Sequence, residues 1–183
     1  MFKDLHPQVT LDITLSDRVV DLLEEAYDVA IRIASLESST LVSKRLASTR
    51  MVLCASPHYL ERQGVPRHPG ELTRHVVIAY SYWSTRDEWR FEGPQGPVSV
   101  KTQPCIQTNS GDTCRAAALA HQGVILQPTF LVGQDLSKGT LVELMPEFRS
   151  IELGIYAVYP TRKHVSAKVR ALIEFLATHF AGR

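Results

Sequence analysis

The sequence has no long hydrophobic run. No stretch of its 183 residues approaches the roughly 20 consecutive apolar residues that a helix needs to span a membrane. The first nine residues include Lys3, Asp4, His6 and Pro7, so they do not form the apolar core of a signal peptide. The sequence therefore predicts a protein of the cytoplasm with no membrane partner.

Cysteine is scarce, and the familiar catalytic and metal-binding motifs are missing. The three cysteines have no C-x-x-C spacing, and the seven histidines show no spacing typical of metal ligands. No G-x-S-x-G, H-E-x-x-H, Walker or G-x-G-x-x-G motif occurs. Cys114 and His121 lie two turns apart on one predicted helix, too far for a thiolate–imidazole pair. We expect no cofactor, no metal, no catalytic residue and no enzyme.

The charge of the chain is nearly balanced. Lys and Arg number 20, Asp and Glu number 19, and the net charge is +1. The basic residues are scattered and form no polybasic run. Because DNA binding depends mainly on neutralising phosphates, this chain is not expected to bind DNA directly.

Strand and helix patterns alternate along the chain, which favours an α/β fold with a mostly parallel sheet. Residues 9–15 alternate apolar with polar side chains and predict a half-buried strand. Ser16 then begins a predicted helix over 18–26, and residues 28–33 predict the next strand. The helix would bury one apolar stripe, made of Val19, Leu22, Leu23 and Ala26.

The rest of the chain continues this alternation. Ser56, Pro57 and Gly64 frame a short predicted helix, and a Pro-started turn follows at 69–72. Further strands are predicted at 51–55, 75–80, 105–108, 124–126 and 151–159, a hairpin at 89–91 and 98–101, and helices after Asp112, Pro128 and Ser166.

Two polar turns, each between a predicted strand and a predicted helix, are the candidate binding sites. One is at Ser16 and Asp17. The other contains Thr108, Asn109, Ser110, Gly111 and Asp112. Ligands of open α/β sheets bind beyond the carboxyl ends of strands, where helix N-termini favour an anion such as a carboxylate. The alternative at each turn is that the side chains only cap a helix.

Arg32 interrupts an otherwise apolar strand. An arginine there can bind a ligand carboxylate through two parallel hydrogen bonds. It can equally pair with a carboxylate of the protein or lie on an exposed face, and the sequence leaves these alternatives open.

Residues 9–18 and 27–33 closely resemble the effector-binding domain of LysR-type transcriptional regulators. The same resemblance continues, in order, through residues 53–60, 68–72, 109–112, 120–124, 126–128 and 165–176. It covers essentially the whole chain. No single motif is diagnostic, but the order and spacing of the motifs together are specific.

The resemblance implies a two-lobed α/β fold similar to type II periplasmic solute-binding proteins. Its sheets would be mixed and mostly parallel, with flanking helices. Lobe I would comprise residues 1–53 and 156–183, and lobe II residues 54–155, joined by crossover strands at 51–55 and 155–159. The family binds small-molecule effectors between the lobes and forms homo-oligomers, here a homodimer or homotetramer.

The resemblance also implies which residues bind the effector, expected to be a carboxylate. They lie in the two candidate turns, on the strand that contains Arg32 and on lobe II. These residues are Ser16, Asp17, Ile31, Arg32, Tyr80, Thr108, Asn109, Ser110, Gly111, Asp112 and Gln127.

The sequence departs from the family pattern at its start. Family members begin with a winged helix-turn-helix and a long linker helix, and neither pattern occurs here. The first strand of lobe I is also missing, and the chain starts inside what should be the first helix, at residues 2–5. We therefore expect a truncated sensing domain whose parent contacts DNA through another part.

Two other functions are compatible with an α/β chain of this kind. A solute-binding protein for transport would need an export signal, which the first residues lack. A small enzyme acting on a carboxylate would need a nucleophile–base or acid–base pair at the two turns. The turns contain only hydroxyls, an amide and acidic side chains.

Overall fold

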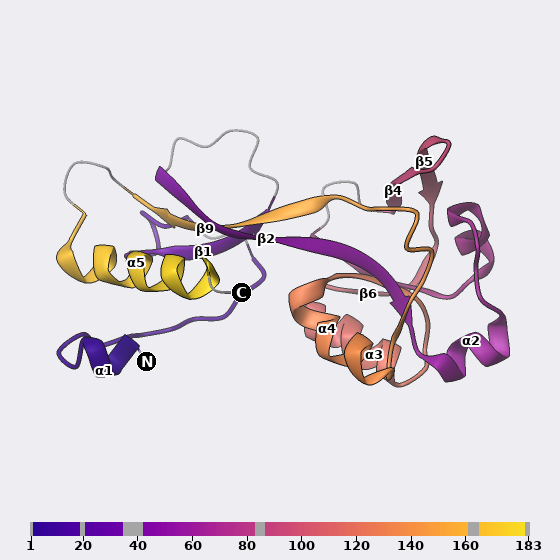
Figure 1. Cartoon of the computed structure of the whole chain (residues 1–183), viewed down its shortest axis with the longest axis horizontal. Coiled ribbons are helices and arrows are strands. Elements are labelled where there is room, and N and C mark those ends of the chain that lie inside the picture. The colour runs from indigo at the N-terminus through magenta and orange to yellow at the C-terminus, as the bar shows by residue number, and fades with distance from the viewer. Residues whose placement is uncertain (1, 19–20, 35–41, 83–86, 161–164, 182–183) are drawn as a thin grey trace. The chain divides into compact units, whose positions relative to one another are not determined.

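Helices and strands alternate along most of the chain (Figure 1). The computed structural model describes residues 2–18, 21–34, 42–82, 87–160 and 165–181. The helices are α1 (Phe2–Leu5), α2 (Pro57–Gln63), the 3-10 helix η1 (Pro69–Arg74), α3 (Gly111–Leu119), α4 (Thr129–Lys138) and α5 (Ala167–Ala181). The strands are β1 (Ala30–Ala34), β2 (Val42–Ala55), β3 (Val77–Tyr80), β4 (Glu88–Gly93), β5 (Gly96–Lys101), β6 (Pro104–Thr108), β7 (Ile125–Pro128), β8 (Val142–Glu143) and β9 (Glu152–Tyr159).

The chain divides into two compact units. Unit 1 consists of Met1–Ser48 and Leu153–Arg183, and unit 2 of Thr49–Glu152. The boundaries lie a few residues before the predicted lobe boundaries at 53 and 155. Strand β2 passes through the first boundary, so one continuous strand contributes residues to both units.

In unit 1, helix α5 packs against the sheet that contains β1 and β9. Strand β1 pairs antiparallel with β9, in a register that places Arg32 opposite Tyr156. The core between the helix and the sheet is formed by Ala157, Val169 and Ile173. The predicted last helix is thereby confirmed as α5, and Val169 and Ile173 lie on its buried face.

The predicted strand at residues 9–15 is not formed. These residues have no regular secondary structure, and Leu11, Ile13 and Leu15 have exposed side chains, Leu15 at 91%. An alternating pattern forms a stable strand only where a neighbouring strand and a core accept its backbone and apolar side chains. Among the described residues of unit 1, the strands that form are β1, β9 and β2.

Where a helix is predicted over residues 18–26, the described residues 21–26 form a single turn. The Asp21 carboxylate accepts the N–H groups of Leu23 and Glu24, so Asp21 begins the turn in place of Ser16. Ala26 ends it with a left-handed backbone at φ 56°. Leu22 is buried, but Leu23 is 67% exposed and Ala26 is also exposed, so of these three predicted stripe residues only Leu22 is buried. A helix of one turn is not stable alone. Val19 lies outside the described residues.

In unit 2, helices α3 and α4 enclose one apolar core together with strands β2, β3 and β7. Its buried members are Val52, Cys54, Ile78, Cys114, Ala118, Ile125, Val132 and Leu141. The predicted short helix is confirmed as α2, with Ser56 accepting the Tyr59 N–H and Gly64 ending the helix at φ 84°. The predicted hairpin is confirmed as β4 and β5.

The sheets are mixed as predicted, but among the strand pairs whose register the described residues give, antiparallel pairing predominates over the expected parallel pairing. Strand β2 runs antiparallel to β7 and β8, β1 runs antiparallel to β9, and β4 and β5 form a hairpin. Parallel pairing joins β3 to β6. Alternation of strands and helices predicts parallel pairing only between strands joined by a crossover helix, and here the long strands pair across other connections.

Strand β3 is held on one side by the segment around Gly123. The Val124 N–H donates to the Val76 carbonyl at 2.9 Å, and the Ile78 N–H donates to the Val124 carbonyl at 3.0 Å. A Cβ atom on Gly123 would lie 2.5 Å from the Val76 carbonyl oxygen. Only glycine therefore allows the two backbones to approach this closely.

None of the described helices combines the length and apolar character needed to cross a membrane.

Two glycine substitutions test this junction. Gly123→Ala should lower the free energy of unfolding by about 1–3 kcal/mol, because the new methyl group meets backbone that cannot move aside. Gly133→Ala, inside α4 with open space at its Cβ position, should raise it by roughly 0.5–1 kcal/mol. Urea denaturation of both variants measures the difference, and equal effects would contradict the close approach.

Candidate functional site

The candidate site lies in unit 2, where the parallel strands β3 and β6 end side by side. Tyr80, the last residue of β3, is in register with Thr108, the last residue of β6. The Ser81 N–H donates to the Thr108 carbonyl at 2.8 Å. The carboxyl ends of parallel strands meet at one edge of a sheet. The pairing therefore brings together Tyr80 and the 108–112 turn, which are 28 residues apart in sequence.

Two hydroxyl groups of the 108–112 turn are oriented by backbone hydrogen bonds. The Thr108 hydroxyl oxygen accepts the Ser110 N–H at 3.2 Å, and the Ser110 hydroxyl oxygen accepts the Thr113 N–H at 3.3 Å. Ser110 is thus the N-cap of α3, as the capping alternative predicts. Because each oxygen already accepts a backbone hydrogen, each hydroxyl hydrogen can still be donated to a third group.

Gln127 lies against the first residue of α3. Its side chain is 3% exposed, and a Cβ atom on Gly111 would lie 3.2 Å from its amide oxygen. The same Cβ atom would lie 3.0 Å from Leu131 of α4. The absence of a side chain at residue 111 therefore lets Gln127 reach the N-terminus of α3, where the helix dipole is positive.

The remaining predicted residues of this turn are more exposed. Asn109 and Asp112 are exposed, whereas Thr108, Ser110 and Gly111 are partly buried. Sequence reasoning missed two neighbours of the site. Tyr82 packs edge-on against Tyr80 with ring centroids 5.9 Å apart, and Leu131 contacts the site from α4. Tyr82 follows the end of β3 by two residues, and the Tyr-x-Tyr spacing was the available signal.

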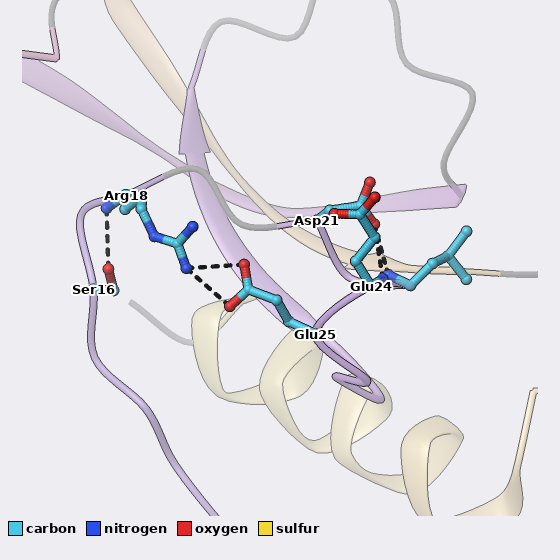
Figure 2. Close-up of polar contacts among 6 residues, drawn as sticks. Ser16, Arg18, Asp21, Glu24 and Glu25 are labelled. Carbon is cyan, nitrogen blue, oxygen red and sulfur yellow. Dashed lines mark hydrogen bonds and ion pairs between the residues drawn. The ribbon is translucent and has the colours of Figure 1, made fainter.

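The predicted residues of unit 1 lie in different local settings. The Ser16 hydroxyl accepts the Arg18 N–H at 3.1 Å, and the Arg18 guanidinium binds both carboxylate oxygens of Glu25 at 2.9 Å (Figure 2). Ser16 therefore orients an exposed bend and does not cap a helix. Asp17 is exposed in the same bend.

Ile31 and Arg32 lie in β1. Ile31 is 46% exposed, whereas Arg32 is half-buried on the opposite face of the strand. In a strand, successive side chains point to opposite faces. A ligand bound to one face of β1 can therefore contact only one of these two side chains.

An ion pair between α3 and α4 supports the candidate site. Arg115 donates from Nε and Nη2 to the two carboxylate oxygens of Asp135, at 2.5 Å and 2.9 Å. The Asp135 side chain is 8% exposed and that of Arg115 is 34% exposed. The hydrogen bonds from Arg115 lower the pKa of Asp135 and outweigh its burial, with a smaller contribution from Thr140. The pair fixes α3 against α4 one turn after Gly111.

The three cysteines differ in their exposure to solvent. Within the described ranges, no three His, Cys, Asp or Glu side chains are grouped so that they could hold a metal ion. Cys54 and Cys114 are buried in the core of unit 2, and Cys105 is exposed. Burial, with Glu143 and Asp135 nearby, raises the pKa of Cys54 to about 12.

Comparison with known proteins decides the family. The family described as LysR substrate binding domain matches residues 1–181. The chain belongs to this family. The predicted resemblance to the effector-binding domain of LysR-type regulators is thereby confirmed.

The relatives of this LysR substrate binding domain are longer proteins. An HTH-type transcriptional regulator of Haemophilus influenzae is 34% identical over 171 residues, covering 93% of this chain and 59% of the relative. The Escherichia coli regulator DmlR is 32% identical over 180 residues, covering 96% of this chain and 57% of the relative. The chain thus spans about 60% of the length of the curated relatives it matches.

Solved structures of LysR-type regulators share the fold. The regulatory domain of CrgA from Neisseria meningitidis superposes with a TM-score of 0.87 at 28% identity, covering 98% of this chain and 88% of that one. Full-length AphB from Vibrio cholerae superposes with a TM-score of 0.85 at 25% identity, covering 98% of this chain and 61% of that one. These likenesses confirm the predicted two-lobed α/β fold class. The predicted lobe boundaries and effector residues stay predictions.

Arg115→Gln should destabilise the LysR substrate binding domain by about 3 kcal/mol, because it leaves the buried Asp135 carboxylate without its cation. The folded-state pKa of Asp135 lies below its unfolded value. Its contribution is therefore complete above pH of about 3.9 and is lost as the pH falls through the folded-state pKa. Over that acidic range Arg115→Gln should lose less stability than the unsubstituted chain. Urea denaturation at pH 7 and at several acidic pH values tests both effects.

Arg50→Gln is the matched control, because its partner Glu143 and Arg50 itself are 26% and 49% exposed. Its change in unfolding free energy should stay within about 1 kcal/mol. An equal effect of the two substitutions would contradict the special role of the α3–α4 pair.

A thiol reagent applied to the native chain at pH 7–8 should label Cys105 alone, since Cys54 and Cys114 are excluded from solvent. In denaturant, all three thiols should react. Mass spectrometry of the labelled peptides measures this. Rapid native labelling of Cys54 would contradict its burial and raised pKa.

Proposed function

We propose that this chain senses a small anionic effector at the end of β6 and the start of α3. The observation that carries the proposal is the pair of hydroxyl groups of Thr108 and Ser110. Each accepts a backbone N–H and keeps its own hydrogen for a ligand. A ligand met by two hydroxyl donors and the positive end of a helix must itself offer acceptor oxygens.

The residues around the turn support a small carboxylate as the effector. Gln127 adds a buried amide beside Gly111, and the paired rings of Tyr80 and Tyr82 offer apolar surface near the end of β3. Small-molecule sites combine apolar walls with a few fixed polar groups. An effector with a carboxylate and a compact apolar body fits this combination.

The parent protein acts, in this proposal, as a DNA-binding transcriptional regulator of the cytoplasm that assembles as a homodimer or homotetramer. The relatives are HTH-type transcriptional regulators, and this chain spans only part of their length. Its net charge is only +1, and its basic residues form no polybasic run in the sequence. DNA binding is therefore assigned to another part of the parent.

We assign binding without turnover to the site. Its groups are hydroxyls, an amide, glycine backbone and the exposed Asp112. Nucleophilic catalysis needs a base within hydrogen-bond reach of the nucleophile. The hydrogen bonds of the Thr108 and Ser110 side chains join them to backbone N–H groups of the turn, which are not bases.

Thermal unfolding with matched pairs of ligands tests the proposal. Benzoate and succinate should raise the unfolding temperature with increasing concentration, while benzamide and succinamide should not, because they lack the negative charge. Thr108→Val should weaken carboxylate binding about 10- to 100-fold, the effect expected for losing a hydrogen bond to a charged group.

Thr73→Val is the matched control, because Thr73 donates to the Gly70 carbonyl on η1, away from the 108–112 turn. Its affinity for carboxylates should equal that of the unsubstituted chain. Equal stabilisation by acids and amides would refute the anionic effector, and equal affinity of Thr108→Val would remove Thr108 from the site. Conversion of a ligand, followed by NMR, would refute binding without turnover.

A further inference from the structure

A buried tyrosine links helix α2 to the start of strand β3. Tyr59 is 3% exposed, and its hydroxyl oxygen accepts the Val76 N–H at 2.9 Å. The same hydroxyl lies 3.1 Å from Nδ1 of His75. The Tyr59 and His75 rings are tilted by 51°, with centroids 5.9 Å apart. One hydroxyl group thus contacts two successive residues where the chain enters β3.

The hydrogen bonds of this hydroxyl favour one state of the histidine ring. A tyrosine hydroxyl has one hydrogen to donate, and here its oxygen already accepts the Val76 N–H. The hydroxyl hydrogen still needs an acceptor in this buried setting, and Nδ1 of His75 lies within reach of it at 3.1 Å. An Nδ1 that accepts a hydrogen bond carries no proton, so the ring is neutral with its hydrogen on Nε2.

We propose that Tyr59 and His75 form a proton-sensitive latch, which holds α2 to the start of β3 while His75 is neutral and releases it when His75 takes up a proton. Protonation places an N–H donor on Nδ1 opposite the hydroxyl. Tyr59 must then turn its own hydrogen into surroundings that are almost closed to water. A buried donor left without an acceptor is costly, so the Tyr59–His75 contact weakens.

The groups around the latch set the direction of its pH response. Burial lowers the pKa of His75, although the Glu71 carboxylate on η1 acts in the opposite direction. Burial raises the pKa of Tyr59, with Cys105 of β6 adding to the effect, so the phenol keeps its hydrogen at neutral pH. The latch therefore contributes its full stability above pH of about 6.5 and loses it as the pH falls through the lower folded-state pKa of His75.

The latch lies at the opposite end of β3 from the candidate effector site. Val76, whose N–H it holds, also accepts the Val124 N–H and precedes the four-residue strand that ends at Tyr80. Loosening the start of so short a strand changes how firmly its last residue is held. The geometry thus supplies a physical route by which proton concentration acts on unit 2 without a ligand.

NMR on the ¹⁵N-labelled 183-residue chain tests the latch through two readouts. The ring nitrogens of His75 should show the neutral form with hydrogen on Nε2 at pH 7.5, titrating below pH of about 6.5. The protection of the Val76 amide against hydrogen exchange, corrected for intrinsic chemistry, should fall roughly three- to tenfold between pH 7.5 and pH 5, the effect of losing one hydrogen bond.

Three substitutions separate the latch from general acid destabilisation. His75→Asn should make Val76 protection independent of pH, and Tyr59→Phe should raise the titration midpoint of His75 toward its ordinary value. His58→Asn, on the exposed surface of α2, should leave both readouts unchanged.

Two results would overturn the proposal. One is a neutral His75 ring with hydrogen on Nδ1. The other is an equal loss of Val76 protection in His75→Asn and in the unsubstituted chain. If Tyr59→Phe does not fold, the comparison with His75→Asn still decides, because the asparagine variant keeps the Tyr59 hydroxyl.

Discussion

The parallel pairing of β3 with β6 is the constraint on which the rest of unit 2 depends. Backbone hydrogen bonds on both sides of this four-residue strand fix its register, toward β6 and toward Val124. At the end of β3 the register places Tyr80 beside Thr108, and at its start it places Val76 within reach of Tyr59. On the side of β3 away from β6, Gly123 allows Val124 to pair with Val76, because any side chain at residue 123 would meet the Val76 carbonyl. A shift of one residue would move Tyr80 to the other face of the sheet.

A largely buried ion pair stabilises the neighbouring helices of unit 2. The bidentate pair of Arg115 and Asp135 joins α3 to α4 next to the turn that presents Ser110. Other ion pairs, such as Arg18 with Glu25, lie on exposed surface and contribute little because water and salt screen them. Ser110 therefore caps a helix that this ion pair joins to α4, whereas Ser16 lies in an exposed bend. Rigid support is what a specific binding site requires, since ordering a mobile site on binding lowers the affinity.

In unit 1, whether an amphipathic sequence pattern forms a strand or a helix depends on the segments around it. Residues 9–15 carry the alternation of a strand, yet Leu11, Ile13 and Leu15 are exposed and the backbone forms no sheet. The following apolar stripe forms one turn between Asp21 and Ala26. In contrast, residues 167–181 form the predicted helix, because β9 supplies Ala157 as a surface for Val169 and Ile173. An amphipathic segment becomes regular structure when a neighbour accepts its apolar face.

The sequence by itself determined the family, the order of most elements and the local features that act within a few residues. Ser56 and Gly64 bound α2 as predicted, and the polar turn at 108–112 begins α3 at Ser110. These features follow from capping and backbone preferences, which need no distant partner. Only the tertiary structure decided that pairing is mostly antiparallel, that Gln127 lies against Gly111 and that Tyr59 reaches His75. Each of these contacts joins residues distant in sequence through strand register or packing, and no local pattern encodes which partner a strand or a side chain will meet.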